Sequence, residues 1–287
     1  MKRSQTSWTA QGTTAMRAIE SAKPTDMRIC YDPLARQFVV PWFYQIIRLL
    51  AGYGERRTHG ALTFIVCRCR YLDDYLQQCL QAGVAQVVIL GAGLDSRAYR
   101  GALVQGAVKT FEVDHPATQA CKLSRLKAVL GAIPAHVTYV PIDFNVETLD
   151  TLLACGFDPS LKTLFLWEGV TQYLQAEAVD ATLAWVRTHA APGSTIIFDY
   201  LCAAELPNVP TPRNRVYAVL TRLTGERRDF GIQHSRIVDF LAERGFTHVT
   251  DVSAEQLRRL YCTGPNQGRM VATNYAIVHA EVAESWR

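Results

Sequence analysis

The sequence lacks several features that would place it in a special class of protein. Its eight cysteines form no C-x-x-C pair, so a structural zinc site is not predicted. Scattered thiols in a chain without a leader are typical of a reducing cytosol. The first residues, MKRSQTSWTAQGTT, contain no apolar core of signal-peptide length. The most apolar early run, Phe38 to Leu50, is interrupted by polar residues and is too short to cross a bilayer. We therefore expect a cytoplasmic protein without a membrane segment.

An excess of charge of one sign is also missing. The 287 residues include 30 Lys and Arg and 26 Asp and Glu, and the resulting net charge of +4 predicts no nucleic-acid or membrane partner. Apolar residues make up 49% of the chain and charged residues 20%, which is ordinary for a globular protein and argues against long disordered segments. A chain of this length can bury a substantial core, as one α/β domain or as a domain with a cap.

A glycine-rich turn lies in the most informative stretch, residues 86–115. Gln86 to Leu90 is an apolar, β-branched run that predicts a buried parallel strand, and a helix is expected after the turn. Gly91 and Gly93 lack Cβ atoms, so a ligand can lie directly on their backbone. The next predicted strand, Val108 to Val113, is followed by Asp114. An acid at this position can accept hydrogen bonds from the hydroxyls of a ribose.

Two kinds of nucleoside cofactor fit such a turn. A dinucleotide site favours G-x-G-x-x-G, but the third glycine is replaced by Ser96. Asp95 would also place negative charge close to a pyrophosphate. S-adenosylmethionine has no phosphate and carries a sulfonium and an ammonium, so acids favour it. The pattern therefore indicates S-adenosylmethionine rather than NAD. The structural alternative is a tight strand-to-helix turn that binds no ligand.

The remaining pattern predicts an α/β fold. From residue 81 to 200, strands and helices alternate, which is typical of a doubly wound parallel sheet. Two late apolar runs are expected to add an antiparallel edge and complete a seven-stranded sheet. We expect residues 1–80 to form a helical cap, residues 81–287 to form the ligand-binding domain, and residues 203–230 to form an insertion after the fifth strand. The later predicted strands are 136–142, 161–167, 195–200, 246–252 and 272–280.

Three motifs in this order resemble the leucine carboxyl methyltransferase family, which includes protein phosphatase methyltransferases and tetracenomycin-type carboxyl methyltransferases. The motifs are LGAGLDSRAYR, FEVDHP and LWEGVTQYL. Further stretches are similar to bacterial members, so the resemblance covers nearly the whole chain: TAMRAIE, YDPLARQFV, RCRYLDD, PIDFN and FGIQHSRIVDFLAERGF. The resemblance implies a class I methyltransferase sheet that binds S-adenosylmethionine.

The resemblance also assigns residues to parts of the cofactor. It implies that Arg68, or as second choice Arg70, holds the methionine carboxylate. It implies that Asp143 receives the adenine amine and that Phe144 packs on the ring. Read without the resemblance, the arginines fit a salt-bridged amphipathic helix, and Asp143 fits the cap of a helix that begins near Glu147.

Two residues after the fourth predicted strand have implied roles in the active site. Glu168 follows an apolar strand at the edge of the sheet where ligands bind, and the resemblance implies that it pairs with the cofactor ammonium. Tyr173 matches the motif tyrosine and either orients a substrate oxygen or only packs. In the insertion, Arg213 and Arg215 either attract an acidic substrate or form a solvated basic loop.

The type of group that accepts the methyl decides whether the enzyme needs a general base. Methyl transfer from a sulfonium is an in-line displacement, and an ionised carboxylate needs no general base, whereas a hydroxyl usually does. His115 and His234 fit surface or capping roles better than that of a base. We therefore expect O-methylation of a small, biosynthetic carboxylic acid without a metal. The alternatives are a hydroxyl O-methyltransferase and a non-catalytic protein that binds S-adenosylmethionine.

Overall fold

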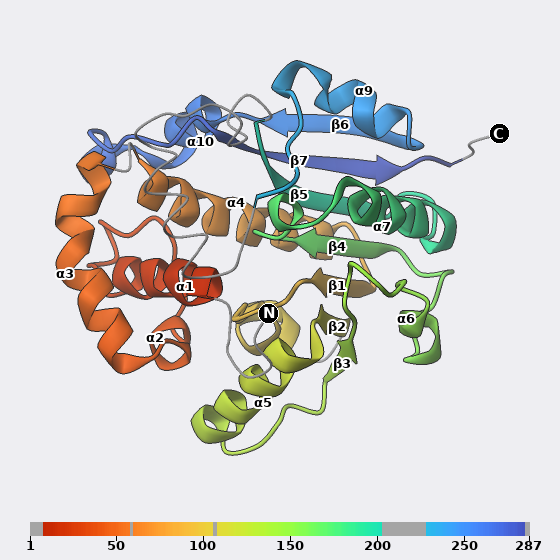
Figure 1. The fold of residues 1–287 in the computed structure, drawn as a ribbon, viewed down its shortest axis with the longest axis horizontal. Coiled ribbons are helices and arrows are strands. Elements are labelled where there is room, and N and C mark those ends of the chain that lie inside the picture. The colour runs from red at the N-terminus through yellow and green to blue at the C-terminus, as the bar shows by residue number, and fades with distance from the viewer. Residues whose placement is uncertain (1–7, 58–59, 106–107, 203–227, 285–287) are drawn as a thin grey trace.

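A seven-stranded sheet forms the centre of the computed structural model, which describes residues 8–57, 60–105, 108–202 and 228–284 (Figure 1). The strand order is β3-β2-β1-β4-β5-β7-β6. β7 runs antiparallel to both of its neighbours, and the other neighbouring pairs are parallel. The predicted doubly wound sheet with an antiparallel edge is therefore confirmed. The strands are β1 Gln86–Leu90, β2 Lys109–Asp114, β3 Val137–Pro141, β4 Thr163–Trp167, β5 Thr195–Leu201, β6 Phe246–Val252 and β7 Tyr275–Val282.

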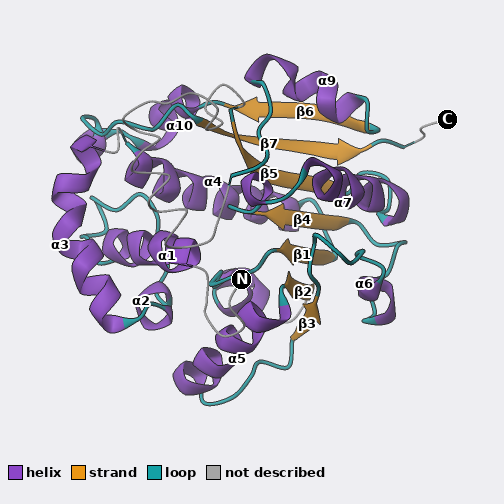
Figure 2. Ribbon diagram, in the orientation of Figure 1, coloured by secondary structure: helices purple, strands orange, loops and turns teal. Residues whose placement is uncertain are grey.

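Helices cover both faces of the sheet (Figure 2). They are α1 Trp8–Ser21, α2 Ala35–Phe38, α3 Pro41–Arg57, α4 Ala61–Gln81, α5 Pro116–Leu130, α6 Thr151–Ala154, α7 Ala176–His189, α9 Ile237–Ala242 and α10 Ala254–Tyr261. The arrowheads of β1 and β4 point toward the end of the molecule where α1 and α3 lie, and β7 points the opposite way (Figure 1). The helical N-terminal segment therefore lies beside the carboxyl edge of the parallel strands.

Each face of the sheet packs into its own hydrophobic core, because successive side chains of a strand point to opposite faces. Ile89 and Ile197 pack with α4 on one face, whereas Leu90 and Phe198 pack with α7 on the other. All seven residues of β5 are buried. Strands covered on both sides read as continuous apolar runs, which explains why the sequence pattern predicted them well.

One predicted helix does not form. The turn after β1 leads into two short 3-10 helices, η1 Arg97–Tyr99 and η2 Gly101–Gln105, in place of an α-helix. The side chain of Asp95 accepts the Arg97 N–H at 2.7 Å, and Gly101 has a φ of 63°. Both features favour a turn over a continuous helix. The expectation of a continuous helix directly after the glycine turn is therefore wrong.

A second correction concerns the loop after β3. No helix begins near Glu147; α6 begins at Thr151. Asp143 instead organises a turn, because its side chain accepts the Asn145 N–H at 3.1 Å and its own N–H donates to Glu147 Oε2 at 2.8 Å. Asp143 thus lies in a polar turn at the carboxyl edge of β3.

Candidate active site

The glycine turn after β1 is closely packed. Gly91 has a φ of 64°, and a Cβ at this position would lie 2.3 Å from a methyl group of Val170. Val170 belongs to the loop that follows β4, so this contact joins the two central loops of the carboxyl edge. Gly93 also has a positive φ, and its nearest non-local neighbour is the Cβ of Ala10 on α1. Both glycines are required by the backbone, and α1 lies directly over the turn.

Asp114 lies at the end of β2 and contacts this turn. Its Oδ2 accepts the Gly93 N–H, and its Oδ1 accepts the His115 N–H at 2.6 Å. Burial raises the pKa of Asp114, and these two amides oppose that effect. Each carboxylate oxygen has a second acceptor site, so the side chain can still accept hydrogen bonds from a diol. The structure therefore places Asp114 beside the glycine turn, as predicted.

Asp143 and Phe144 lie at the neighbouring strand end. His115 Nε2 lies 3.7 Å from Asp143 Oδ2, so the polar groups after β2 and β3 are adjacent. The ring of Phe144 stacks on Trp167 of β4, with centroids 6.4 Å apart. An acid next to an aromatic ring provides a polar group and an apolar surface for a flat heterocycle.

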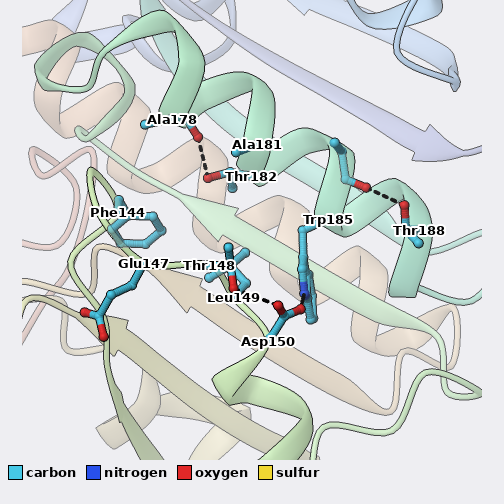
Figure 3. Close-up of a pocket in the computed structure, with 11 residues that line it drawn as sticks. Phe144, Glu147, Thr148, Leu149, Asp150, Ala178, Ala181, Thr182, Trp185 and Thr188 are labelled. Carbon is cyan, nitrogen blue, oxygen red and sulfur yellow. Dashed lines mark hydrogen bonds between the residues drawn. The ribbon is translucent and has the colours of Figure 1, made fainter.

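A cavity of about 230 Å³ lies between α7 and the loop after β3 (Figure 3). Of the predicted site residues, only Phe144 lines it. Among its polar side chains, Trp185 Nε1 donates to Asp150 Oδ1 at 2.8 Å and Thr182 donates to the Ala178 carbonyl, whereas Glu147 Oε2 accepts the Asp143 N–H. This cavity is therefore separate from the charged groups described next.

Glu168 is held by two arginines. Its Oε1 lies 2.9 Å from Arg68 Nε, and its Oε2 lies 2.6 Å from Arg97 Nη1. The side chain is 7% exposed. Burial alone would raise the pKa of Glu168, but the charges of Arg97 and Arg68 lower it well below its usual range. Glu168 is therefore an ionised carboxylate with both oxygens already engaged.

A second acid, which the sequence pattern did not single out, belongs to the same cluster. Asp199 of β5 is fully buried, and its Oδ2 lies 2.6 Å from Arg68 Nη1. Its Oδ1 accepts the Gly169 N–H at 2.5 Å. Asp199 could have been predicted from the same pattern as Glu168, because it is an acid near the end of an apolar strand at the carboxyl edge.

The sequence analysis also did not predict a role for Arg97, because only the glycines of the motif indicated a ligand. Its guanidinium bonds Asp73 on α4, Asp95 and Glu168, and it donates to the Cys69 carbonyl at 3.2 Å. Arg97 therefore neutralises Asp95. The argument that Asp95 would repel a pyrophosphate is weakened, and the missing third glycine at Ser96 remains the argument against a dinucleotide.

The cluster carries an excess of negative charge. Five carboxylates (Asp32, Asp73, Asp95, Glu168 and Asp199) share four guanidiniums (Arg17, Arg68, Arg97 and Arg100). Buried charges are favourable only when they are compensated, so the cluster suits a cationic ligand. Arg70, the second choice for a cofactor ligand, lies outside the cluster, because it is half-exposed and pairs with Asp74 at 2.8 Å.

Tyr173 ends a short 3-10 helix, η3 Thr171–Tyr173, after β4. This helix is tied to β5, because Thr171 Oγ1 donates to the Asp199 carbonyl at 2.7 Å. The short helix that ends at Tyr173 therefore lies against β5 at the carboxyl edge. The predicted substrate-binding residues Arg213 and Arg215 lie outside the described residues.

The two candidate bases differ in their surroundings. His115 is the N-cap of α5, and its Nδ1 accepts the Ala117 N–H at 3.2 Å. His234 Nδ1 lies 3.0 Å from Asp251 Oδ2 and 2.8 Å from Tyr200 Oη. His115 is thus a capping residue, as expected, whereas His234 has an acidic partner that the sequence did not reveal.

The described residues contain neither a metal-binding group of side chains nor a helix that could span a membrane. No group of three or more His, Cys, Asp or Glu side chains there could hold a metal ion. Among the helices of the described residues, none has both the length and the apolar character needed to span a membrane.

Comparison with known proteins identifies the family. Residues 10–187 match the family model described as leucine carboxyl methyltransferase. A protein of Mycolicibacterium vanbaalenii, provisionally named an S-adenosyl-L-methionine-dependent methyltransferase, is 33% identical over 267 residues, 88% of this chain and 86% of its own. A Bacillus subtilis protein with the same provisional description is 40% identical over 136 residues, but the match covers 47% of this chain and 44% of that protein.

The fold agrees with these matches. A crystal structure of a provisionally named methyltransferase from Thermobifida fusca superposes with a TM-score of 0.57, covering 96% of this chain and 94% of that chain at 16% identity. At this identity the likeness supports the fold alone. The family-model match and the identity across most of the Mycolicibacterium protein support more than the fold. The chain belongs to the leucine carboxyl methyltransferase family of S-adenosylmethionine-dependent methyltransferases.

Proposed function

We propose that this protein transfers the methyl group of S-adenosylmethionine to the carboxylate of a small acid and produces a methyl ester. The observation that carries the proposal is the match of residues 10–187 to leucine carboxyl methyltransferase. A biosynthetic acid is the favoured substrate over a protein phosphatase, because the motifs TAMRAIE and LGAGLDSRAYR resemble those of bacterial members.

The residues at the carboxyl edge fit the cofactor. Asp114 would hold the ribose, Asp143 and Phe144 the adenine, and Arg68 the methionine carboxylate. Arg68 suits this role, because no hydrogen bond or ion pair within the described residues uses its Nη2. The excess negative charge around Glu168 would favour the ammonium and the sulfonium. The sulfonium supplies an activated methyl group, and the residues of this chain supply alignment.

A carboxylate acceptor explains why the site needs no base. Such an acceptor is already ionised at neutral pH, so the protein has only to orient it and exclude water. Tyr173 would orient one substrate oxygen through its hydroxyl. Arg213 and Arg215 would attract the acid before it binds. His115 has no role in proton transfer, because its ring caps α5.

The test combines binding with product chemistry. We expect calorimetry to show binding of S-adenosylmethionine and S-adenosylhomocysteine and no binding of NADH. Radiolabelled methyl transfer to a panel of carboxylic acids should then give a product that releases methanol in alkali, because methyl esters hydrolyse there and methyl ethers do not. An alkali-stable product would overturn the carboxyl assignment. Cofactor binding without transfer to any acid or alcohol would favour a non-catalytic binding protein.

A hydroxyl acceptor is the second candidate, and the pair of His234 and Asp251 is the observation that favours it. A carboxylate on one ring nitrogen orients a histidine, as a general base requires. In that case His234→Gln should abolish turnover and leave the affinity for S-adenosylhomocysteine unchanged. If a carboxylate is the acceptor, the same variant should keep most of its activity.

A further inference from the structure

Asp199 is the buried acid for which the proposed function gives no role. It lies on β5 and is fully buried. One of its oxygens contacts Arg68 Nη1 at 2.6 Å, and the other accepts the Gly169 N–H at 2.5 Å. Its backbone carbonyl accepts the Thr171 hydroxyl at 2.7 Å. Asp199 thus contacts a predicted cofactor ligand and the loop that follows β4 at the same time.

The geometry of Arg68 depends on two acids. Glu168 binds its Nε at 2.9 Å and Asp199 binds its Nη1, so the plane of the guanidinium is set from two sides. The remaining nitrogen, Nη2, lies against Gly169, since a Cβ there would be 3.3 Å away. Gly169 is the second residue after β4, at the carboxyl edge of the sheet. Arg68 Nη2 therefore lies at the edge where the cofactor binds in the proposed function.

We infer that Asp199 is a positioning residue. It orients Arg68 so that Nη2 points at the methionine carboxylate of the cofactor, and it holds the Gly169 amide beside that guanidinium. This inference rests on the proposed function only for the identity of the cofactor, not for that of the methyl acceptor. A guanidinium fork gains strength from fixed geometry, because less side-chain entropy is lost when the ligand binds. Asp199 supplies that geometry without touching the cofactor.

The chemistry of the side chain allows a precise substitution. Asn has the shape of Asp, and its amide oxygen can still accept the Gly169 N–H. Its amide nitrogen would then face Arg68 Nη1, and two donors cannot bond. Asp199→Asn therefore breaks the contact with Arg68 while it preserves the contact with the loop. Burial of Asp199, which raises the pKa of this carboxyl, also means that no water can replace the lost partner easily.

The test uses two nucleosides that differ only in the amino-acid part. S-adenosylhomocysteine has the methionine-type carboxylate, and 5′-methylthioadenosine lacks the whole amino-acid group. For Asp199→Asn we expect the affinity for S-adenosylhomocysteine to fall by roughly 10- to 100-fold, the size of one charged hydrogen bond, and the affinity for 5′-methylthioadenosine to change by less than about twofold. An equal loss for both nucleosides would show a merely structural role and overturn the inference.

A double-mutant cycle supplies the second readout. In an Arg68→Met background, Asp199→Asn should cause no further loss of affinity for S-adenosylhomocysteine, because the residue through which it acts is gone. Additive losses would contradict the inference. Asp180→Asn, an exposed acid on α7 paired with Arg244, is the matched control and should change neither affinity. Thermal unfolding of each variant confirms that the comparison is made on folded protein.

The outcomes separate this inference from the proposed function. If the wild-type protein binds S-adenosylhomocysteine but methylates no carboxylic acid, the acceptor assignment fails and the inference about Asp199 is still decided by the two affinities. If the wild-type protein binds 5′-methylthioadenosine and S-adenosylhomocysteine equally well, Arg68 makes no use of the carboxylate and the inference is wrong.

Discussion

Arg97 Nη1 lies 2.6 Å from Glu168 Oε2, and this contact joins the turn after β1 to the loop after β4. The two residues are 71 positions apart in the chain, and their side chains are 1% and 7% exposed. Ion pairs this deep interact strongly, because little solvent screens them. The pair therefore connects the nucleoside end of the predicted site with its amino-acid end.

Removing Arg97 should destabilise the protein. Arg97→Met leaves Asp95 and Glu168 with less compensation, and breaking a buried ion pair on one side typically costs about 3–5 kcal/mol. Urea unfolding of the variant measures this loss as a lower midpoint. Arg258→Ala, which removes an exposed partner of Glu255, is the control and should change the free energy of unfolding by less than about 1 kcal/mol. Equal stabilities of the two variants would contradict the interpretation that the buried ion pairs of Arg97 stabilise the protein.

Gly91→Ala should be more harmful than Gly131→Ala, although both glycines have a positive φ. Both Gly91 and Gly131 require the left-handed region, which costs a residue with a Cβ about 1–2 kcal/mol. Only Gly91 also meets a neighbour, the Val170 methyl group, which adds about 1–3 kcal/mol of overpacking. Gly131→Ala is the matched control, because nothing lies near its Cβ. Chemical denaturation of both variants gives the difference, and the affinity for S-adenosylhomocysteine should fall only for Gly91→Ala.

His279 on β7 should make stability depend on pH. Burial lowers the pKa of His279 from 6.5 to about 4, with a small opposing effect of Glu281, and its ring lies 4.3 Å from that of Tyr75. The unfolded chain takes up this proton at a higher pH than the folded chain, so stability is present above pH 6.5 and is lost as the pH falls toward 4. Unfolding midpoints of the wild type should fall more steeply in this window than those of His279→Gln. Parallel curves would show that the ring is not buried in neutral form.

The cysteines should fall into two classes of reactivity. No disulfide joins any of the eight; five are buried, and Cys121, Cys155 and Cys202 are partly exposed. A hydrogen bond with Cys262, together with burial, raises the pKa of Cys67, and thiols react as thiolates. At neutral pH we expect a disulfide reagent to modify the three partly exposed thiols first and the other five only after unfolding. Rapid reaction of all eight would contradict the packing around α4.

The strands were predictable because burial on both faces leaves a continuous apolar run. The predicted strands 86–90 and 246–252 have the observed bounds, and the others differ by a few residues at their ends. The glycine turn and the acids after β2, β3 and β4 were predictable for the same reason, since strand ends in a parallel sheet meet at one edge. The division near residue 80 and the roles assigned to single side chains stay predictions.

The short helices between the strands were harder to predict. The η1 and η2 helices replaced an α-helix because Asp95, Arg97 and Arg100 bond to partners on or near the turn, including Asp73 on α4. The helix α10 was also not predicted between the last two strands, although its Ser253 and Gln256 capping box is a local signal. The explanation for η1 and η2 lies in their distant partners. Local propensity carries no information about partners that lie far away in the chain.

The sequence alone determined the family and the order of the strands along the chain, and it predicts the carboxyl edge as the place for a ligand, because these follow from hydrophobic periodicity and from motifs that are contiguous in the chain. The tertiary structure alone decided which charges meet. Arg68, Arg97, Glu168 and Asp199 come from four separate segments, and only the parallel packing of β1, β4 and β5 with α4 brings them within hydrogen-bonding distance. Their pairing depends on distance in space, which a linear pattern does not record.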